Sequence, residues 1–283
     1  MKNIYFFIFF INILYSIQTT ENGINYNGGN DEWECSIENQ SPINIKFYEF
    51  LTNNKNGVFT EEIPTVQFIK TYYPPLNGEE LDNNLEMDIN DKIKAKAFIK
   101  YKNISCIYDA KKLRLHIFSE HTFDDTKNDI EIQIMHKKEI NSKSICPENL
   151  GISIFFSTQN NKKSKVINRF YKVNEDEKTN LYKRYVLSKV SSIELDKYTN
   201  DKTGYFWYIG SGTFPSNYPF GCNDEVYWIL CKKVRDMSND ELRGIIASTL
   251  KIYPNGNARS TGKDDKKRDN TEKIKVYYND KFE

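Results

Sequence analysis

The sequence predicts a mainly β protein, and two features of the chain lead to this fold class. Short runs with period-two alternation or continuous apolar character recur along the chain between polar turns, whereas long helical patterns are few. The 283 residues include 18 Phe and 19 Tyr, which together with Ile supply enough apolar surface for a sizeable core. Because the chain has neither an internal repeat nor an obvious linker, we expect residues 21–283 to form a single domain.

The N-terminal segment is typical of a signal peptide. Met1 and Lys2 give a short basic start, and Ile4 to Leu14 is almost entirely Ile, Phe, Tyr and Leu. Such a run is too short for an ordinary membrane span, and its flanks fit a buried first strand less well. We therefore expect residues 1–20 to be a signal peptide and the mature protein to be secreted or lumenal. No second long apolar run follows, so we expect no membrane span.

The remaining elements are predicted from local patterns. Residues 47–95 are rich in turn signals and are expected to be mostly loops. Runs with strand character lie at 96–101, 113–117, 130–136, 151–156 and 226–230. One helix start is clear, because Ser238 to Glu241 reads Ser-Asn-Asp-Glu, a capping box, and apolar residues follow at helical spacing. The charged segment 255–272 is expected to be a solvated loop.

Charge and cysteine content narrow the function classes. The formal net charge of +1 gives no reason to expect a nucleic-acid partner or an acidic membrane. The chain has five cysteines, and in an oxidising compartment they predict one or two disulfides with at least one cysteine left over. Their spacing alone does not determine the pairing.

Two alternating runs place polar side chains on a common face. Side chains two residues apart point to the same side of a strand, so Arg114 shares a face with His116, and Glu131 shares one with Gln133. If the two strands are neighbours, these four side chains converge. Polar groups in such a place need partners or a function. An Arg–Glu ion pair with a hydrogen-bonded histidine is the structural interpretation, and a functional site is the alternative.

Three segments, in this order, resemble the α-class carbonic anhydrases. Residues 40–45 read Gln-Ser-Pro-Ile-Asn-Ile, close to the family's Gln-Ser-Pro-Ile-Asn/Asp-Ile. Residues 113–136 contain Ser-Glu-His-Thr between two alternating strands, where the family has aromatic-His-x-His-Trp, Ser-Glu-His-Thr and Glu-Leu-His-Leu-Val-His. Residues 208–215 read Tyr-Ile-Gly-Ser-Gly-Thr-Phe-Pro, similar to Tyr-x-Gly-Ser-Leu-Thr-Thr-Pro-Pro, and a Cys-Asn-Asp-Glu-Val-Tyr-Trp segment follows. Together these segments span most of the mature chain.

The resemblance implies an α-carbonic-anhydrase fold, a large, twisted, mostly antiparallel central sheet with a few peripheral helices. It also implies a disulfide between Cys35 and Cys222, as in the family's secreted members. Cys106 and Cys146 are then a candidate second pair. Cys231, on a buried-looking strand, is expected to be a free core cysteine.

The resemblance places the family's three zinc-binding histidines at Arg114, His116 and Gln133. A zinc hydratase site needs three protein ligands and a water whose pKa the metal lowers to about 7. His116 qualifies as a ligand, and Gln133 offers a neutral amide oxygen. The guanidinium of Arg114 has no lone pair to donate and stays cationic. We therefore expect Arg114 to bind Glu131, or an anion such as bicarbonate, in place of a metal.

Other positions of the family's site are only partly retained. Glu120 and Thr213 match the pair that orients the zinc-bound hydroxide, and Glu131 matches the carboxylate behind the third ligand. Lys112 replaces the glutamine behind the first ligand. His121 and His136 match histidines outside the metal site. The wall of the substrate pocket is expected at Met135, Ile152, Gly212, Val226 and Trp228.

Two functions follow from the resemblance. The first is a carbonic-anhydrase-related pseudoenzyme that has weak or lost activity and binds a protein or a glycan. Arg114, Gln133 and the missing proton-shuttle histidine favour it, since no histidine precedes His116. The alternative is an active zinc enzyme that interconverts CO2 and bicarbonate, similar to the η class of apicomplexan parasites, which uses two His and one Gln. Gln133 favours this alternative, for which His121 is the candidate second histidine.

Overall fold

The structure is a computed structural model of the 283-residue chain. It describes residues 35, 41–46, 66–76, 81, 85–175, 183–187, 194–200, 203–249 and 277–279. The predicted signal peptide at 1–20 and the predicted loop at 255–272 lie outside the described residues.

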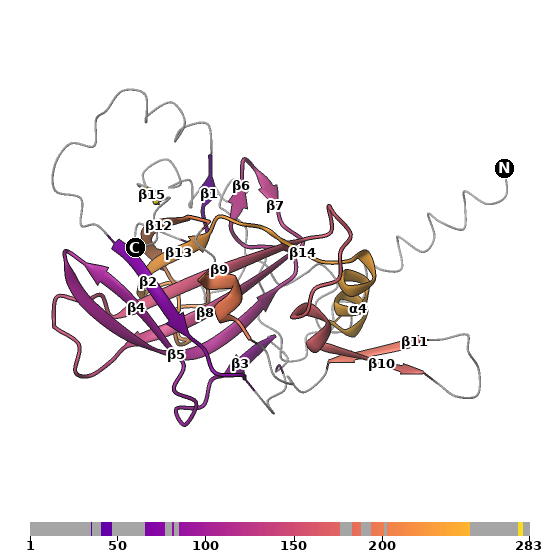
Figure 1. Cartoon of the computed structure of the whole chain (residues 1–283), viewed down its shortest axis with the longest axis horizontal. Helices are drawn as coiled ribbons and strands as arrows, with labels where there is room; N and C mark the ends of the chain where they lie inside the picture. Colours follow the sequence, from indigo (N-terminus) through magenta and orange to yellow (C-terminus); the bar gives the residue numbers. More distant parts are fainter. Residues whose placement is uncertain are drawn as a thin grey trace.

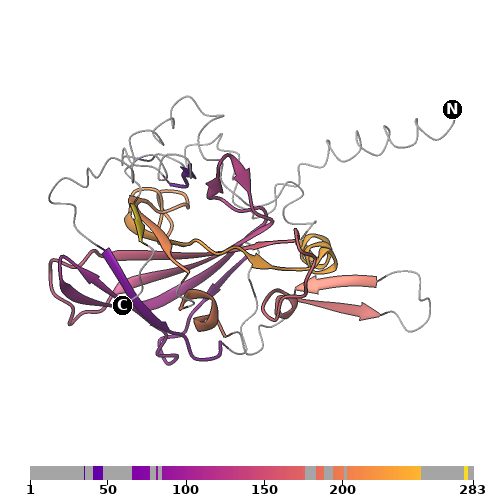
Figure 2. The same cartoon turned by 45° about the horizontal axis from the view of Figure 1, so that its top comes forward.

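A curled ten-stranded sheet dominates the described part of the chain (Figures 1 and 2). The strand order is β15-β12-β13-β9-β8-β5-β4-β2, with β3 paired to β5 and β14 paired to β9. Neighbouring strands run antiparallel except that β13 and β14 are parallel to β9. The strand bounds are β2 Val66–Tyr72, β3 Glu86–Asp88, β4 Lys96–Tyr101, β5 Ile104–His116, β8 Ile130–Lys138, β9 Asn149–Ser157, β12 Tyr205–Ser211, β13 Glu225–Cys231, β14 Arg235–Asp236 and β15 Tyr277–Asn279. The expected large, mostly antiparallel sheet is confirmed.

Smaller elements surround the sheet. A second sheet joins β1 (Asn44–Ile45), β6 (Thr122–Phe123) and β7 (Thr126–Lys127). The hairpin of β10 (Tyr171–Glu175) and β11 (Lys183–Leu187) projects from the sheet beside helix α4 (Asn239–Thr249), at the right of Figure 1. Two short helical segments complete the described elements, η2 (Ile167–Arg169) and α3 (Asp196–Thr199). None of the described helices is long and apolar enough to cross a membrane.

The two faces of the sheet belong to different hydrophobic clusters. Leu113, Leu115 and the isoleucines of β8 lie in the larger cluster. Met135, Phe155, Val226 and Trp228 lie in the smaller one. Alternation along the strands produces this separation, because successive side chains point to opposite faces. The polar side chains of β5 and β8 therefore lie on the same face as the smaller cluster.

The predicted strands at 96–101, 130–136, 151–156 and 226–230 lie within observed strands, and the one at 113–117 extends one residue beyond the end of β5. The expectation that residues 47–95 are mostly loops is wrong for β2 and β3. A register shift between Phe68 and Lys70 interrupts the alternation of β2. β3 has only three residues, Glu-Met-Asp, a pattern with no strand signal.

Two disulfides are present, Cys35–Cys222 and Cys106–Cys146. Cys231 is a buried free cysteine. All three expectations for the cysteines are thus confirmed. Disulfides are typical of oxidising compartments and rare in the cytosol, so the pairing supports the predicted compartment.

Candidate functional site

Strands β5 and β8 bring the predicted polar side chains together. Arg114 is directly opposite Gln133, and His116 is directly opposite Glu131. A register shift between Ala110 and Lys112 precedes these pairs and sets their alignment. The four polar side chains are buried, so each must be compensated inside the protein.

Arg114 is almost completely buried, with 1% of its surface exposed. Its Nε lies 3.0 Å from Glu86 Oε1, and its Nη2 donates a hydrogen bond to the carbonyl oxygen of Pro219 at 2.8 Å. The guanidinium carbon lies 3.5 Å from the ring centroid of Phe214 and 5.9 Å from that of Phe220. The cation is therefore held by one carboxylate, one carbonyl and two aromatic faces.

Glu86 corrects the expectation that Arg114 binds Glu131. Glu86 is opposite Arg114 in the β3–β5 pair, and its side chain is 4% exposed. Its second oxygen accepts a hydrogen bond from Lys112 Nζ at 2.8 Å, and Lys112 also lies 2.9 Å from Asp88. Burial lowers the pKa of Lys112, but the bonds and charges of Glu86 and Asp88 outweigh it and hold that pKa above its ordinary value.

Gln133 uses its whole amide group within the site. Its Nε2 donates hydrogen bonds to Glu120 Oε2 and to Glu131 Oε1, each at 3.0 Å. Its Oε1 accepts a hydrogen bond from Thr213 at 3.3 Å. Gln133 thereby links Thr213 to Glu120, the two residues expected to orient a zinc-bound hydroxide.

Glu131 is a fully buried carboxylate with several hydrogen-bond donors. Its Oε1 lies 2.7 Å from His121 Nδ1 and accepts from Ser153 Oγ at 2.7 Å. Its Oε2 accepts from the backbone amides of Glu120 and His121. Burial raises the pKa of Glu131, but the charge and hydrogen bond of His121 outweigh it, and the pKa falls to about 2. Glu131 is therefore ionised at neutral pH.

The three histidines have different surroundings. His116 Nδ1 lies 3.5 Å from Glu120 Oε1. His121 Nε2 lies 2.7 Å from the hydroxyl of Tyr208, so both of its ring nitrogens are engaged. His136 bonds to Tyr73 at 2.8 Å and to the Leu150 carbonyl at 3.2 Å, and burial lowers its pKa to about 4. The two ring nitrogens of His121, the candidate second histidine, thus contact Glu131 and Tyr208.

The segment between β12 and β13 packs directly onto Arg114. Besides the Pro219 hydrogen bond, a Cβ at Gly212 would lie only 1.8 Å from the Phe220 carbonyl oxygen, so only glycine allows this close approach. Cys222 lies in the same segment and is fixed by its disulfide. The position where the family has a leucine is thus filled by the backbone of residue 220.

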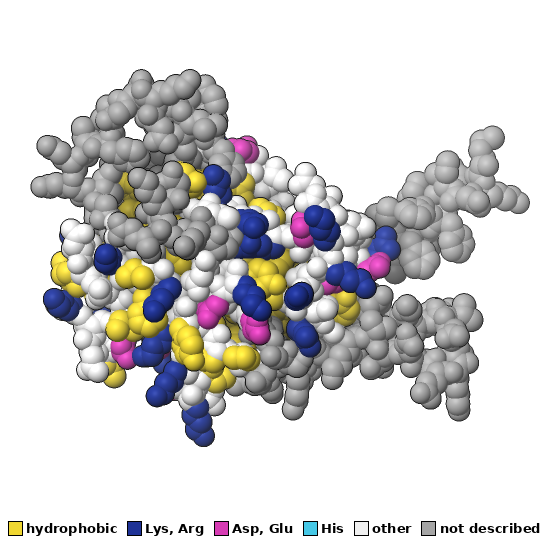
Figure 3. Space-filling model, in the orientation of Figure 1, with side chains coloured by type: hydrophobic (Ala, Val, Ile, Leu, Met, Phe, Trp, Pro, Cys, Tyr) yellow, Lys and Arg dark blue, Asp and Glu magenta, His cyan; other side chains and the backbone are white. Residues whose placement is uncertain are grey.

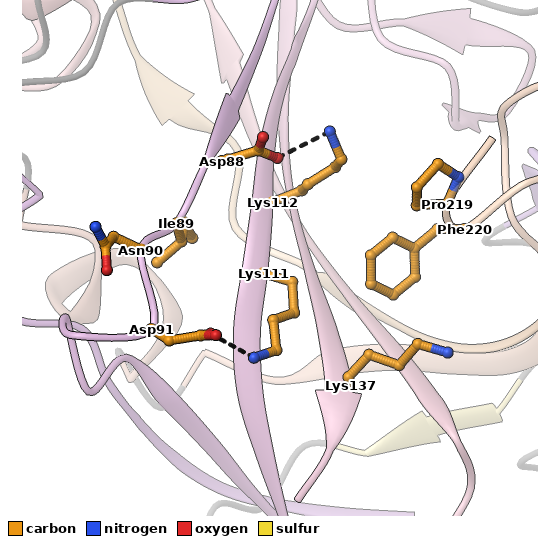
Figure 4. A pocket seen from close by; sticks show the side chains of 9 residues that line it. All are labelled: Asp88, Ile89, Asn90, Asp91, Lys111, Lys112, Lys137, Pro219 and Phe220. Atoms are coloured by element: carbon orange, nitrogen blue, oxygen red, sulfur yellow. Dashed lines mark hydrogen bonds and ion pairs between the residues drawn. The ribbon is translucent and has the colours of Figure 1, made fainter.

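A groove of about 400 Å³ lies beside this segment, with Pro219 and Phe220 in its wall (Figure 4). Lys111 and Lys112 face Asp91 and Asp88 there, and Lys137 and Phe220 form the opposite side. Figure 3 shows basic, acidic and hydrophobic side chains interspersed on one face of the molecule. The groove is open and of mixed charge, and neither His116 nor Gln133 lines it.

The expected pocket wall is only partly in place. Met135, Val226 and Trp228 lie together in the smaller cluster. Ile152 is a correction, because it pairs with Ile134 and packs in the larger cluster on the other face. Gly151 is opposite Met135, and a Cβ there would lie 2.5 Å from the Trp228 ring. The one-residue difference in register explains the error.

The side chains at the three family ligand positions do not fit a zinc site. They are a guanidinium with no lone pair to donate, an imidazole and an amide, so at most two of the three positions can supply a ligand. Zinc sites of this type need three ligands with free lone pairs. Among the described residues, no group of three or more His, Cys, Asp or Glu side chains is arranged to hold a metal.

Comparison with known proteins agrees with the order of the motifs. A family model described as eukaryotic-type carbonic anhydrase matches residues 28–262. No curated protein sequence matches the chain significantly.

Solved structures have a similar fold at low sequence identity. Dioscorin complexed with ascorbate has a TM-score of 0.56 at 18% identity, covering 93% of this chain and 96% of that one. A halotolerant carbonic anhydrase from Dunaliella salina has a TM-score of 0.51 at 17% identity, covering 86% and 89%. The α-carbonic anhydrase of Photobacterium profundum has a TM-score of 0.50 at 15% identity, covering 80% and 85%.

Proposed function

Because this chain belongs to the eukaryotic-type carbonic anhydrase family, we propose that it is a secreted member with weak or lost CO2 hydratase activity, which acts by binding. The partner class is a protein or a glycan. In this proposal the N-terminal 20 residues are a signal peptide, and the two disulfides support an oxidising compartment.

The observation that supports the proposal is the buried guanidinium of Arg114 at the first ligand position. Two unit charges about 4 Å apart near a protein surface interact by about 4 kcal/mol, and a dication would double this repulsion. The charge of Glu86 is already shared between Arg114 and Lys112. A zinc ion would therefore meet a fixed cation beside it and lack one of its three ligands.

The retained residues have a structural role in this proposal. Glu120 and Thr213, which orient the hydroxide in the family, hold the amide of Gln133 instead. The Nε2 of Gln133 donates hydrogen bonds to both carboxylates because the amide presents two N–H groups on one nitrogen. A histidine at this position could not make the same pair of bonds from one nitrogen.

The test is the metal content of the purified mature protein after equilibration with zinc, combined with a stopped-flow CO2 hydration assay. We expect much less than one zinc per chain and no hydration above the buffer rate. Stoichiometric zinc with sulfonamide-sensitive hydration would overturn the proposal and favour the η-type enzyme, in which His116 and Gln133 bind the metal and CO2 or bicarbonate is the substrate.

A series of variants tests the proposal by restoring the missing zinc ligands. Arg114→His with Gln133→His restores the family's three imidazoles, and we expect it to bind zinc where the native protein does not. Adding His116→Ala to this double variant removes one of the three imidazoles and should abolish the restored zinc binding. The triple variant distinguishes a restored site from zinc bound elsewhere on the surface.

A further inference from the structure

The turn between β4 and β5 contains an acceptor motif for N-linked glycosylation. The motif is Asn-x-Ser/Thr with x other than proline, and the sequence has it at two places, Asn103-Ile104-Ser105 and Asn39-Gln40-Ser41. The two motifs have different structural surroundings.

Asn103 lies at the tip of a tight hairpin. Tyr101 and Ile104 are the last paired residues of β4 and β5, so Lys102 and Asn103 alone form the turn. Their φ angles are 49° and 64°, the left-handed conformation that two-residue hairpin turns require and that asparagine tolerates well. This hairpin lies at the end of the sheet seen at the left of Figure 1, away from α4.

The side chains of this motif are accessible. Lys102, Asn103 and Ser105 are exposed. Among the described residues, nothing forms a side-chain hydrogen bond with Asn103 or Ser105. An attached glycan would extend into solvent from the hairpin tip without displacing a packed group.

We propose that Asn103 is an N-glycosylation site. The sugar donor for this modification is a lipid-pyrophosphate-linked oligosaccharide. The side-chain nitrogen of Asn103 forms a bond to C1 of the sugar at the reducing end. The bond between C1 and the pyrophosphate oxygen breaks, and the lipid pyrophosphate leaves with the electron pair. The amide proton is lost to a base, so the step needs no oxidant or reductant.

The second motif provides a comparison within the same chain. Ser41 is 2% exposed, and its Oγ accepts hydrogen bonds from the Tyr208 hydroxyl at 2.9 Å and from the Ser211 backbone amide at 3.2 Å. Asn39 lies outside the described residues. A glycan on Asn39 would be only two residues from this buried group, so we expect Asn103 to be modified and Asn39 not.

The compartment needed for this reaction is the one that the disulfides support. Oligosaccharide transfer takes place in the secretory pathway, where Cys35–Cys222 and Cys106–Cys146 would also form. Asn103 precedes the first residue of β5, whereas Arg114 and His116 lie at the other end of this strand, so glycosylation does not depend on whether the protein is an enzyme.

The test is to translate the full chain with endoplasmic-reticulum microsomes and compare electrophoretic mobility before and after treatment with peptide-N-glycosidase. We expect a shift that the glycosidase removes, leaving aspartate at position 103 in peptide mass spectra. Asn103→Gln and Ser105→Ala should each abolish the shift. Ser105→Ala keeps the asparagine that the turn favours, so a folding defect of Asn103→Gln cannot imitate the result. Ser105→Thr should retain the shift, and Asn39→Gln should leave it unchanged.

Three results would overturn the inference. One is a chain that enters the microsomes and forms its disulfides but has no glycan. Another is a glycan that survives both Asn103→Gln and Ser105→Ala, or that disappears with Asn39→Gln. The third is a chain that does not enter the microsomes at all, because the reaction then has no compartment in which to occur.

Discussion

Burial of Arg114 must be compensated by its neighbours, because an isolated charge in the interior costs several kcal/mol. The carboxylate of Glu86 forms a buried ion pair with Arg114 at 3.0 Å. The aromatic ring of Phe214 and the Pro219 carbonyl supplement this pair. Glu86 is thus central to the stability of the site, although it belongs to a strand of three residues.

Neutralising Glu86 should therefore be much more costly than neutralising Asp88. Both acids lie on β3 and both contact Lys112, but the Glu86 side chain is 4% exposed and that of Asp88 is 79% exposed. We expect Glu86→Gln to lower the free energy of unfolding by about 3 kcal/mol and Asp88→Asn to change it by less than about 1 kcal/mol. Urea denaturation at pH 7 measures both. Equal effects of the two substitutions would contradict a buried ion pair at Arg114.

The pH dependence of stability should contain a contribution from His136. Its pKa of about 4 lies below the ordinary value of 6.5, so between these values the unfolded chain binds a proton that the folded protein does not. Stability therefore decreases as the pH falls from 6.5 to 4, by about 3 kcal/mol for this group.

His136→Asn isolates this contribution. Asparagine does not titrate, and its amide can still donate to the Leu150 carbonyl that His136 contacts. We expect the difference in unfolding free energy between native protein and variant to shrink as the pH falls from 6.5 to 4. Both proteins should still lose stability between pH 4.5 and 2. In this range Glu131 binds a proton in the unfolded chain but stays ionised in the folded protein. A difference that is constant with pH would contradict a buried neutral His136.

The sequence predicted some of these residue-level features and missed others for physical reasons. Period-two alternation predicts the convergence of Arg114 with Gln133, because alternation is local to each strand. The partner Glu86 could not be predicted, since pairing between β3 and β5 depends on the fold of the chain between them. Ile152 was expected in the pocket wall only from the family resemblance, and a shift of one residue between the two sequences moves a side chain to the other face of the strand.

At the scale of elements, helix α4 begins as its sequence predicts. The Ser238 hydroxyl accepts a hydrogen bond from the Glu241 amide at 3.2 Å, and the Glu241 carboxylate accepts from the Ser238 amide at 2.7 Å. This reciprocal pair is a capping box, and it could be recognised because its residues are three apart. Glu241 also accepts a hydrogen bond from the backbone amide of Ser164 at 2.9 Å. The local pattern does not reveal this second role, because Ser164 is far from Glu241 in the sequence.

Glu241 should therefore contribute more stability than an ordinary capping residue. Glu241→Ala leaves the buried Ser164 amide and the Ser238 amide without their acceptor, and each such loss costs about 1–3 kcal/mol. We expect a decrease of roughly 2–4 kcal/mol in the free energy of unfolding. Asp240→Ala is the matched control in the same helical turn, since that side chain is 84% exposed, and it should change stability by less than about 0.5 kcal/mol. If both variants unfold alike in urea, the bond to Ser164 contributes nothing.

Element boundaries were less predictable where pairing is irregular. β2 was expected to be loop, because the register shift between Phe68 and Lys70 breaks its pattern. The backbone of β2 is also bound by a residue far away in the sequence. The Tyr205 hydroxyl donates a hydrogen bond to the Val66 carbonyl and accepts one from the Phe68 amide. A tyrosine on β12 thus bonds to the backbone of β2 and connects two strands that lie far apart in the strand order of the sheet.

At the scale of the whole molecule, the order of three motifs predicted the architecture that local patterns alone could not. Alternating strands predict a β protein, but the order β12-β13-β9-β8-β5-β4-β2 is set by pairings between residues far apart in the chain. The disulfides constrain the same long-range arrangement. Cys35 and Cys222 are 187 residues apart and Cys106 and Cys146 are 40 apart, so the first closes a much larger loop of the unfolded chain.

The two disulfides should therefore stabilise the fold by different amounts. In the chain-entropy account, closing loops of these lengths contributes about 5 kcal/mol for Cys35–Cys222 and about 4 kcal/mol for Cys106–Cys146 at 25 °C. Replacing each pair by alanines should lower the free energy of unfolding in urea by about these amounts, with the larger loss for the longer loop. Cys231→Ala is the control, because it removes a buried thiol without removing a cross-link, and we expect a cost of about 1 kcal/mol. Reducing the native protein without mutation should reproduce the combined loss of both pairs. If instead the Cys106–Cys146 variant loses more than the Cys35–Cys222 variant, packing around the sulfur atoms outweighs loop closure, and the entropic explanation is wrong for this protein.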